Sequence, residues 1–170
     1  MVYWTKFQFV KWQVTLAATE QGLCYVGLAD DSEQCMFDWC YKKFGKVEMV
    51  KGANRLATYA NEIAKYLSGV QTDFIDLPID RQGTPFQLQV WHALQEIPYG
   101  DTVSYSVIAN SIGKPSAVRA VASAIGNNPL LLVIPCHRVV GKDGSLSGYR
   151  DGKEVKAQLH QLENSSKTIG

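Results

Sequence analysis

Apolar and polar positions alternate in short runs near the start of the chain, and this pattern predicts β-structure. Residues 12–18 and 23–29 form two such runs around a polar turn at 19–22, which is typical of a hairpin. Residues 73–79 predict a further strand. Pro78 has no amide hydrogen to donate, so it limits that strand to an edge or an end of a sheet.

Between these runs the apolar spacing changes to that of helices. Residues 32–44 and 53–67 are predicted to be helical, and the second segment carries its apolar residues at helical spacing. These residues are Leu56, Tyr59, Ala60, Ile63, Ala64 and Leu67. A polar break follows at 80–83, so we place a domain boundary there and predict an N-terminal domain over residues 1–80.

The second half of the chain is predicted to be mostly helical. Thr84 is suited to an N-cap and Pro85 to the first position of a helix, which should stop near residues 97–100. Ser104 can cap a short helix that runs through Ile112. A helical domain is therefore expected from residue 84 onward.

A second short helix should follow the turn at 113–115. Ser116 is expected to cap it, and Gly126 to end it. A helix pair joined by so short a turn resembles a helix-turn-helix unit, although many helix pairs look alike. The apolar run 130–134 then predicts a short strand that leads to residues 135–138.

A last helix is expected over residues 154–162. We place the end of the C-terminal domain at Glu163 and assign residues 164–170 to a frayed tail. The order of elements predicts an α+β protein. Its small N-terminal α/β domain has a β-hairpin and helices, and its mostly helical C-terminal domain covers residues 84–163.

Composition narrows the function classes only slightly. The chain has 170 residues, 46% of them hydrophobic, and a net charge of +1, so a global basic excess does not point to nucleic acid. Its four cysteines have no zinc-type spacing, and we expect Cys35 and Cys40 to be buried core thiols rather than metal ligands or a disulfide. No signal peptide and no run long enough for a membrane span is evident, which favours a soluble cytoplasmic protein.

The distribution of charge is more informative than its total. No aspartate or glutamate occurs from Thr102 to Lys142, whereas Lys114, Arg119, Arg138 and Lys142 lie in this window. A polyanion would be attracted to such a face, although a chance gap in a chain of modest charge density has the same pattern. Arg119 lies among small residues, where it could be an ion-pair partner or a probe into a groove.

Cys136 and His137 stand side by side between Pro135 and Arg138. A thiolate is a strong nucleophile, and a neighbouring base can generate it. Adjacent residues on a regular strand point to opposite faces, so the two can cooperate only if the backbone departs from strand geometry or a water carries the proton. The alternative is a buried thiol beside an imidazole with an ordinary structural role.

Two questions about the surroundings of Cys136 remain: which acceptor orients His137, and what Asn128 does. Spacing alone does not choose among the acceptor candidates, which are Glu96, Asp101, Asp143, Asp151, Glu154 and Glu163. Asn128 can fold its amide onto the local backbone in an Asx-type turn. It is then either an ordinary loop residue or a strut that fixes the helix pair against the thiol.

These residues together resemble a known family. The run 135–139, preceded by Asn128 and by a helix that bears Arg119, closely resembles the O6-alkylguanine-DNA alkyltransferases, also called methylated-DNA–protein-cysteine methyltransferases. The ordered matches extend from residue 84 to Tyr149 and cover about half of the chain. The N-terminal half is similar mainly in the order of its elements.

The resemblance implies a role for each matching residue. Cys136 would accept the alkyl group, His137 would be the base acting through water, and Glu163 would orient it. Tyr105 would assist rotation of the nucleotide, and Arg119 would fill the space it leaves. The implied DNA-binding set is Arg119, Tyr105, Ser104, Ser116 and Lys114. The implied base pocket and its support are Asn128, Val139, Tyr149, Arg150 and Pro135.

The implied activity is direct-reversal DNA repair. The chain would transfer the alkyl group of O6-alkylguanine, and of O4-alkylthymine in some members, irreversibly to its own Cys136 after nucleotide flipping. We expect a monomer that acts on double-stranded DNA without cofactor or metal, in the cytoplasm or in a eukaryotic nucleus. Two alternatives are a non-catalytic alkyltransferase-like protein, which would lack the acceptor cysteine, and a cysteine hydrolase, for which no signature is visible.

Overall fold

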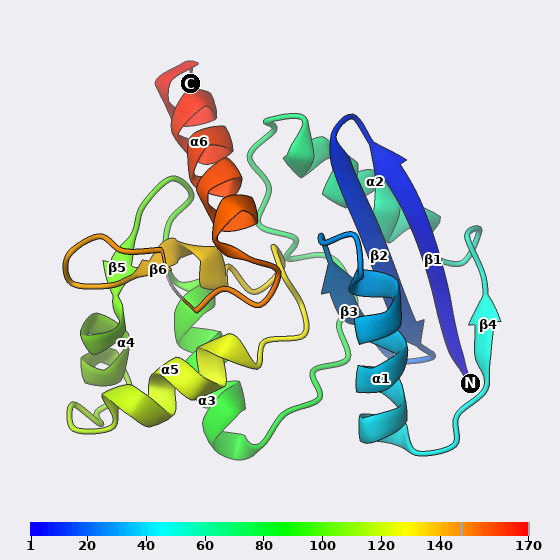
Figure 1. The fold of residues 1–170 in the computed structure, drawn as a ribbon, viewed down its shortest axis with the longest axis horizontal. Helices are drawn as coiled ribbons and strands as arrows, with labels where there is room; N and C mark the ends of the chain where they lie inside the picture. The colour runs from blue at the N-terminus through cyan, green and yellow to red at the C-terminus, as the bar shows by residue number, and fades with distance from the viewer. Residues whose placement is uncertain (147, 170) are drawn as a thin grey trace. The chain divides into compact units, whose positions relative to one another are not determined.

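The computed structural model describes residues 1–146 and 148–169, and it confirms the α+β class (Figure 1). The chain divides into two compact units, Met1–Gln82 and Gly83–Gly170. The first contains a mixed sheet with two helices, and the second is mostly helical.

The first unit is built on a four-stranded sheet in the order β3-β2-β1-β4. The strands are β1 Val2–Phe9, β2 Trp12–Thr19, β3 Gly22–Gly27 and β4 Met49–Lys51. β2 pairs antiparallel with β1 and β3, which confirms the predicted hairpin, and β4 pairs parallel with β1. β1 was not expected from the pattern of its residues.

Two helices pack on this sheet, α1 Ser32–Phe44 and α2 Ala57–Leu67. α1 lies in front of the strands in Figure 1 and α2 behind them. Because both faces are covered, every residue of β3 is buried, which is why this strand reads as a nearly continuous apolar run. α1 has the predicted limits, whereas α2 begins four residues later than the expected start at 53.

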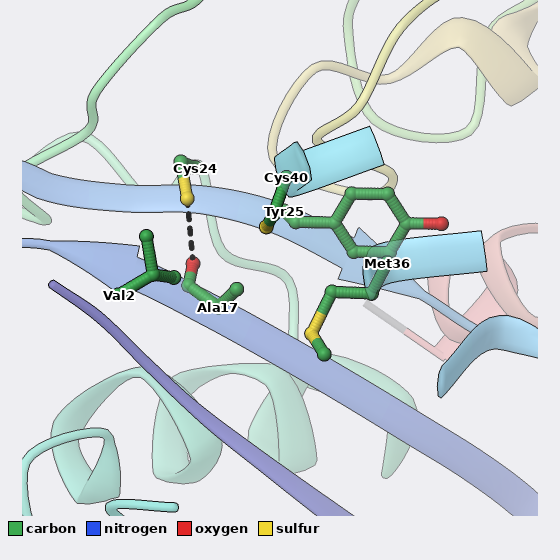
Figure 2. Close-up of a cluster of buried hydrophobic side chains, with 6 residues drawn as sticks. All are labelled: Val2, Ala17, Cys24, Tyr25, Met36 and Cys40. Carbon is green, nitrogen blue, oxygen red and sulfur yellow. Dashed lines mark hydrogen bonds between the residues drawn. The ribbon is translucent and has the colours of Figure 1, made fainter. Parts of the chain in front are cut away.

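The core between α1 and the sheet contains two thiols, as Figure 2 shows. Cys24 and Cys40 are fully buried among Val2, Ala17, Tyr25 and Met36, and Cys24 Sγ donates to the carbonyl of Ala17 at 3.4 Å. Burial of Cys40 confirms the prediction. Cys35, in contrast, is exposed on α1, so the prediction was wrong for that residue.

The strand expected at 73–79 is absent, because only Ile79 forms an isolated bridge, with Leu23. The Leu23 amide donates to the carbonyl of Pro78 at 3.0 Å, and the Asp80 amide donates to Leu23 at 2.9 Å. Pro78 has no amide hydrogen with which to extend this pairing. Gly22 allows the close crossing, since a Cβ there would lie 2.5 Å from the Pro78 backbone.

The second unit begins with α3 Pro85–Gln95, which starts as predicted. Thr84 Oγ1 accepts from the Gln87 amide at 3.2 Å, and the Gln87 side chain accepts from the Thr84 amide at 3.0 Å. This reciprocal capping box stabilises the first turn. Trp91 on the same helix donates its indole hydrogen to the carbonyl of Ala124 at 2.8 Å and so ties α3 to the helix pair.

The helix pair consists of α4 Tyr105–Ser111 and α5 Val118–Gly126. Ser104 caps α4 as predicted, by accepting from the Val107 amide at 3.4 Å. Ser116 does not cap α5; the N-cap residue is Ala117, which makes no side-chain cap. The short strands β5 Val103–Ser104 and β6 Val139–Val140 pair in parallel and join the start of α4 to the segment after Cys136.

The last helix is longer than predicted. α6 runs from Lys153 to Ile169, so most of the segment expected to be a frayed tail continues the helix. Leu159 on this helix is fully buried. Glu163, placed at the domain end from sequence, therefore lies well inside α6 and is 2% exposed.

Candidate active site

The segment that leads to Cys136 is a series of turns, and the strand predicted at 130–134 is wrong. The buried Asn128 side chain supplies hydrogen bonds that the backbone of a neighbouring strand would otherwise supply. Its Oδ1 accepts from the Leu130 amide at 2.9 Å, and its Nδ2 donates to the Ile134 carbonyl at 2.9 Å. Leu132 adopts a φ of 71°, which lies in the left-handed region and outside the β region. The Asx-type turn at Asn128 agrees with the prediction.

Cys136 begins a single 3₁₀ turn, η1 Cys136–Arg138, for which Pro135 is the N-cap residue. The thiol is buried, and Asn128 Nδ2 donates to its Sγ at 3.2 Å. Burial raises the pKa of the Cys136 thiol above its usual value. The hydrogen bond from Asn128 and the positive charges of Arg150 and Lys156 oppose that rise in pKa. The resting thiol is therefore protonated at neutral pH.

Glu163 is hydrogen-bonded to three residues from two parts of the unit. Its Oε1 lies 2.7 Å from His137 Nε2, and its Oε2 accepts from the Gly100 amide at 3.0 Å. Arg138 donates from Nη2 at 2.8 Å and from Nε at 3.1 and 3.2 Å. Burial alone would raise the pKa of Glu163, but the hydrogen bonds from His137 and Arg138 hold it well below its usual range. The carboxylate is thus ionised and bridges η1 to α6.

His137 is fully buried, and burial lowers its pKa, whereas the hydrogen bond to Glu163 opposes that effect. The ring is therefore neutral at pH 7. Because a carboxylate only accepts, the hydrogen of the neutral ring lies on Nε2, and Nδ1 is left as the proton-accepting nitrogen. This is the protonation state that a general base requires.

Two tyrosines flank the thiol. Tyr149 is buried, and burial together with Cys136 raises its pKa well above the usual value. Burial and Cys136 also raise the pKa of the half-buried Tyr105. A Cβ at Gly148 would lie 3.1 Å from Tyr105 Oη, so glycine permits this close approach. Both tyrosines thus remain neutral at pH 7.

Arg150 and Val139 support the site from its two ends. Arg150 Nη1 donates to the Asn128 carbonyl at 3.0 Å, and its Nε donates to Asp151 at 3.0 Å. Val139 is buried and pairs with Val103 through β6 and β5. These contacts hold the backbone on both sides of Cys136.

Two polar residues of α6 that the sequence did not single out also contact this region. Lys156 is 1% exposed and donates from Nζ to the carbonyl of Val139 at 2.5 Å. Burial lowers the pKa of Lys156, although Cys136 opposes that effect. His160 Nε2 hydrogen-bonds the carbonyl of His137. Their spacing from Glu163 on a predicted helix is the signal that could have identified them.

The predicted DNA-binding residues lie mainly on the surface of the helix pair. Arg119, Lys114 and Ser116 are exposed, and Lys114 Nζ lies 5.0 Å above the ring of Phe86. Ser104 is half-buried and acts as the cap of α4. The structure therefore separates these surface residues from the buried cluster around Cys136.

Within residues 1–146 and 148–169, no group of three or more His, Cys, Asp or Glu side chains is arranged to hold a metal ion. In the same part of the chain, no helix has both the length and the apolar character needed to cross a membrane.

Comparison with protein families accounts for both halves of the chain. Residues 2–81 match the model of the 6-O-methylguanine DNA methyltransferase, ribonuclease-like domain, and residues 85–165 match that of the 6-O-methylguanine DNA methyltransferase, DNA binding domain. The chain belongs to the 6-O-methylguanine DNA methyltransferase family. The resemblance seen in the sequence is thereby confirmed.

Individual members of the methyltransferase family resemble the chain over nearly its whole length. It is 49% identical to the inducible methylated-DNA–protein-cysteine methyltransferase of Bacillus subtilis, over 95% of this chain and 90% of that protein. It is 45% identical to the bifunctional transcriptional activator/DNA repair enzyme Ada of Escherichia coli, over 87% of this chain but only 41% of that protein. The chain is therefore a methylated-DNA–protein-cysteine methyltransferase.

Solved structures of the methyltransferase family share its fold. The crystal structure of Mycobacterium tuberculosis OGT in complex with DNA has a TM-score of 0.82 and 33% sequence identity, and the match covers 96% of this chain and 94% of that one. A structure of the same organism's O6-methylguanine methyltransferase has a TM-score of 0.81 and 36% identity, over 98% and 94% of the two chains. The likeness extends over both units.

Proposed function

We propose that this chain repairs O6-alkylguanine in double-stranded DNA by moving the alkyl group to Cys136, once per molecule. Family membership of both halves supports this assignment. The single structural observation that carries it is the buried chain of contacts from Asn128 to Cys136 and from His137 to Glu163. The first contact holds a candidate nucleophile, the second pairs a neutral base with an ionised carboxylate, and the two are linked because Cys136 and His137 are neighbours in η1.

The reaction begins with removal of the thiol proton. In a 3₁₀ turn with about three residues per turn, neighbouring side chains diverge by about 120°. Cys136 and His137 occupy such a turn, so the proton passes from Sγ to His137 Nδ1 through a water molecule rather than directly. Glu163 then stabilises the imidazolium that forms.

The thiolate attacks the alkyl carbon in line with the C–O6 bond. The S–C bond forms as the C–O6 bond breaks, the electron pair stays on O6 of guanine, and the purine takes up a proton. Asn128, Arg150 and Lys156 lower the energy of the thiolate before attack. The thioether has no route back to a thiol, so transfer is stoichiometric.

DNA must deliver the base to a buried sulfur, which requires nucleotide flipping at a cost of a few kcal/mol. We assign Arg119 to the space that the nucleotide leaves, because it is exposed on α5 and projects from a helix rich in small residues. Tyr105 would contact the flipped base beside Cys136. The first unit would act as a structural domain and the second as the DNA-binding and transfer domain.

The test is to count transferred groups. Excess duplex DNA with a labelled O6-methylguanine should label the protein to one methyl per chain, and peptide mass spectrometry should locate it on Cys136. Cys136→Ser should abolish labelling while DNA binding persists. Cys35→Ser is the matched control, because Cys35 is an exposed thiol whose loss should change nothing. No transfer would indicate a lesion-binding protein, and repeated turnover would indicate a hydrolase; either result refutes the proposal.

A further inference from the structure

One face of α6 contacts three consecutive residues of the active-site segment. Lys156 reaches the carbonyl of Val139, His160 reaches the carbonyl of His137, and Glu163 binds the side chains of His137 and Arg138. Positions 156, 160 and 163 share a helix face because they are four and three residues apart. Within residues 137–139, Glu163 therefore holds side chains, whereas Lys156 and His160 hold the main chain.

The direction of the hydrogen bond between His160 and His137 follows from the two groups that form it. A carbonyl oxygen only accepts, so His160 Nε2 carries the hydrogen and donates it to His137. The two imidazole rings lie 6.4 Å apart between centroids and are tilted by 52°, so they do not stack. His137 is thus attached to α6 twice, through its ring by Glu163 and through its carbonyl by His160.

Core packing does not explain the polar residues at these positions. Leu159 on the same helix is fully buried, so α6 also packs through an apolar side chain next to these positions. Burial of the Lys156 ammonium has a desolvation cost, which an apolar residue of similar length would avoid. The carbonyls of His137 and Val139 are the groups that these donors satisfy.

We propose that His160 is a positioning residue for alkyl transfer, which acts with Lys156 to hold the main chain of residues 137–139 so that the base keeps its alignment with Cys136. This inference rests on the proposed function. Misplacement of a catalytic group by about 1 Å can slow a reaction by roughly a hundredfold. Loss of one main-chain contact, with Glu163 still in place, should therefore slow transfer by about tenfold.

The test compares His160→Leu, which cannot donate, with His160→Gln, whose amide nitrogen can replace Nε2. Single-turnover transfer from methylated duplex DNA yields the rate constant at saturating DNA and, separately, the dissociation constant for DNA. Gln161→Leu is the matched control, because Gln161 is the exposed neighbour on the same helix. Lys156→Met tests the second contact, with the exposed Lys153→Met as its control.

We expect His160→Leu to lower the saturating rate constant by about tenfold at an unchanged dissociation constant, and His160→Gln to restore most of it. Equal rates for wild type and His160→Leu would overturn the inference, as would equal losses in the Leu and Gln variants. If His160→Leu fails to fold by circular dichroism, His160→Asn, which is too short to reach the carbonyl, takes its place in the comparison with Gln.

The two proposals fail separately. A wild-type protein that transfers no methyl group refutes the proposed function. In that case the rate at which iodoacetamide modifies Cys136 is measured in wild type, His160→Leu and His160→Gln. Equal rates in all three proteins overturn the positioning role. A wild-type protein that transfers one methyl group, with His160→Leu equally fast, refutes only the inference drawn here.

Discussion

Replacement of Glu163 by glutamine should destabilise the second unit and slow transfer together. Glutamine keeps the size of the side chain but removes the charge that His137, Arg138 and the Gly100 amide share. Arg138 would remain buried without its counter-ion, and breaking a buried ion pair on one side costs about 3–5 kcal/mol. Because the amide oxygen still accepts one hydrogen bond, we expect about 3 kcal/mol, the lower end of that range.

A loss of about 3 kcal/mol in the free energy of unfolding corresponds to a melting temperature lowered by about 10 °C for a chain of this size. The matched control is Glu154→Gln, an exposed carboxylate on the same helix, which should cost less than about 1 kcal/mol. Thermal unfolding followed by circular dichroism measures both variants. A Glu163→Gln variant that melts within about a degree of wild type would show that the buried cluster contributes nothing to stability and that its physical description is wrong.

The pH dependence provides a second check on Glu163. The pKa of Glu163 in the folded protein lies below the unfolded value of about 4.3. Its contribution to the free energy of unfolding is therefore fully present above that pH. The contribution is lost as the pH falls through the depressed folded pKa. The difference in stability between wild type and Glu163→Gln should therefore persist at neutral pH and narrow below about pH 4. A difference that widens in acid would contradict the sign of the shift.

Two further predictions concern the thiol and the DNA-facing helix. Because burial raises the pKa of Cys136, iodoacetamide should modify the exposed Cys35 before Cys136 at pH 7.5, and the Cys136 rate should still rise above about pH 9, as peptide mass spectrometry would show. Arg119→Ala should lower transfer from duplex DNA at least tenfold more than transfer from the free methylated base, measured side by side in single-turnover reactions.

Sequence patterns predicted the elements whose signals are local. Thr84 and Pro85 located the start of α3, and Ser104 that of α4, because caps depend on a few neighbouring residues. β1 was missed because its residues do not alternate cleanly between buried and exposed. Its pairing with β2 and with the distant β4 supplies the stabilisation that the local pattern does not reveal.

The segment before Cys136 shows how an apolar run can mislead. Residues 130–134 are all buried, as a central strand would be, yet their backbone hydrogen bonds go to local turns and to one side chain. Hydrophobicity reports burial and carries no information on which partner satisfies an amide. The informative residue is Asn128, because its Asx turn supplies hydrogen-bond partners to the apolar run that follows it.

The candidate site was predictable to the extent that a family motif covers it. Spacing left six carboxylates as partners for His137, and Glu163 was chosen by resemblance; the structure brings it to 2.7 Å from the imidazole. Lys156 lay inside a predicted helix where a lysine is ordinarily exposed, so only its spacing from Glu163 placed it on the same helix face, and that spacing does not indicate burial. Its burial follows from the docking of α6 on η1, which is a tertiary contact.

The electrostatics of the site suit a protein that reacts only once. An activated thiolate at rest would be alkylated by any small electrophile, and each such event would inactivate a molecule permanently. Burial keeps Cys136 protonated, and Asn128 and the two nearby cations limit the energy of the thiolate that the proposed base, His137, would generate. The reactivity of the sulfur then depends on the alignment of the base more than on the resting pKa, which is why contacts that only position His137 should control the rate of transfer.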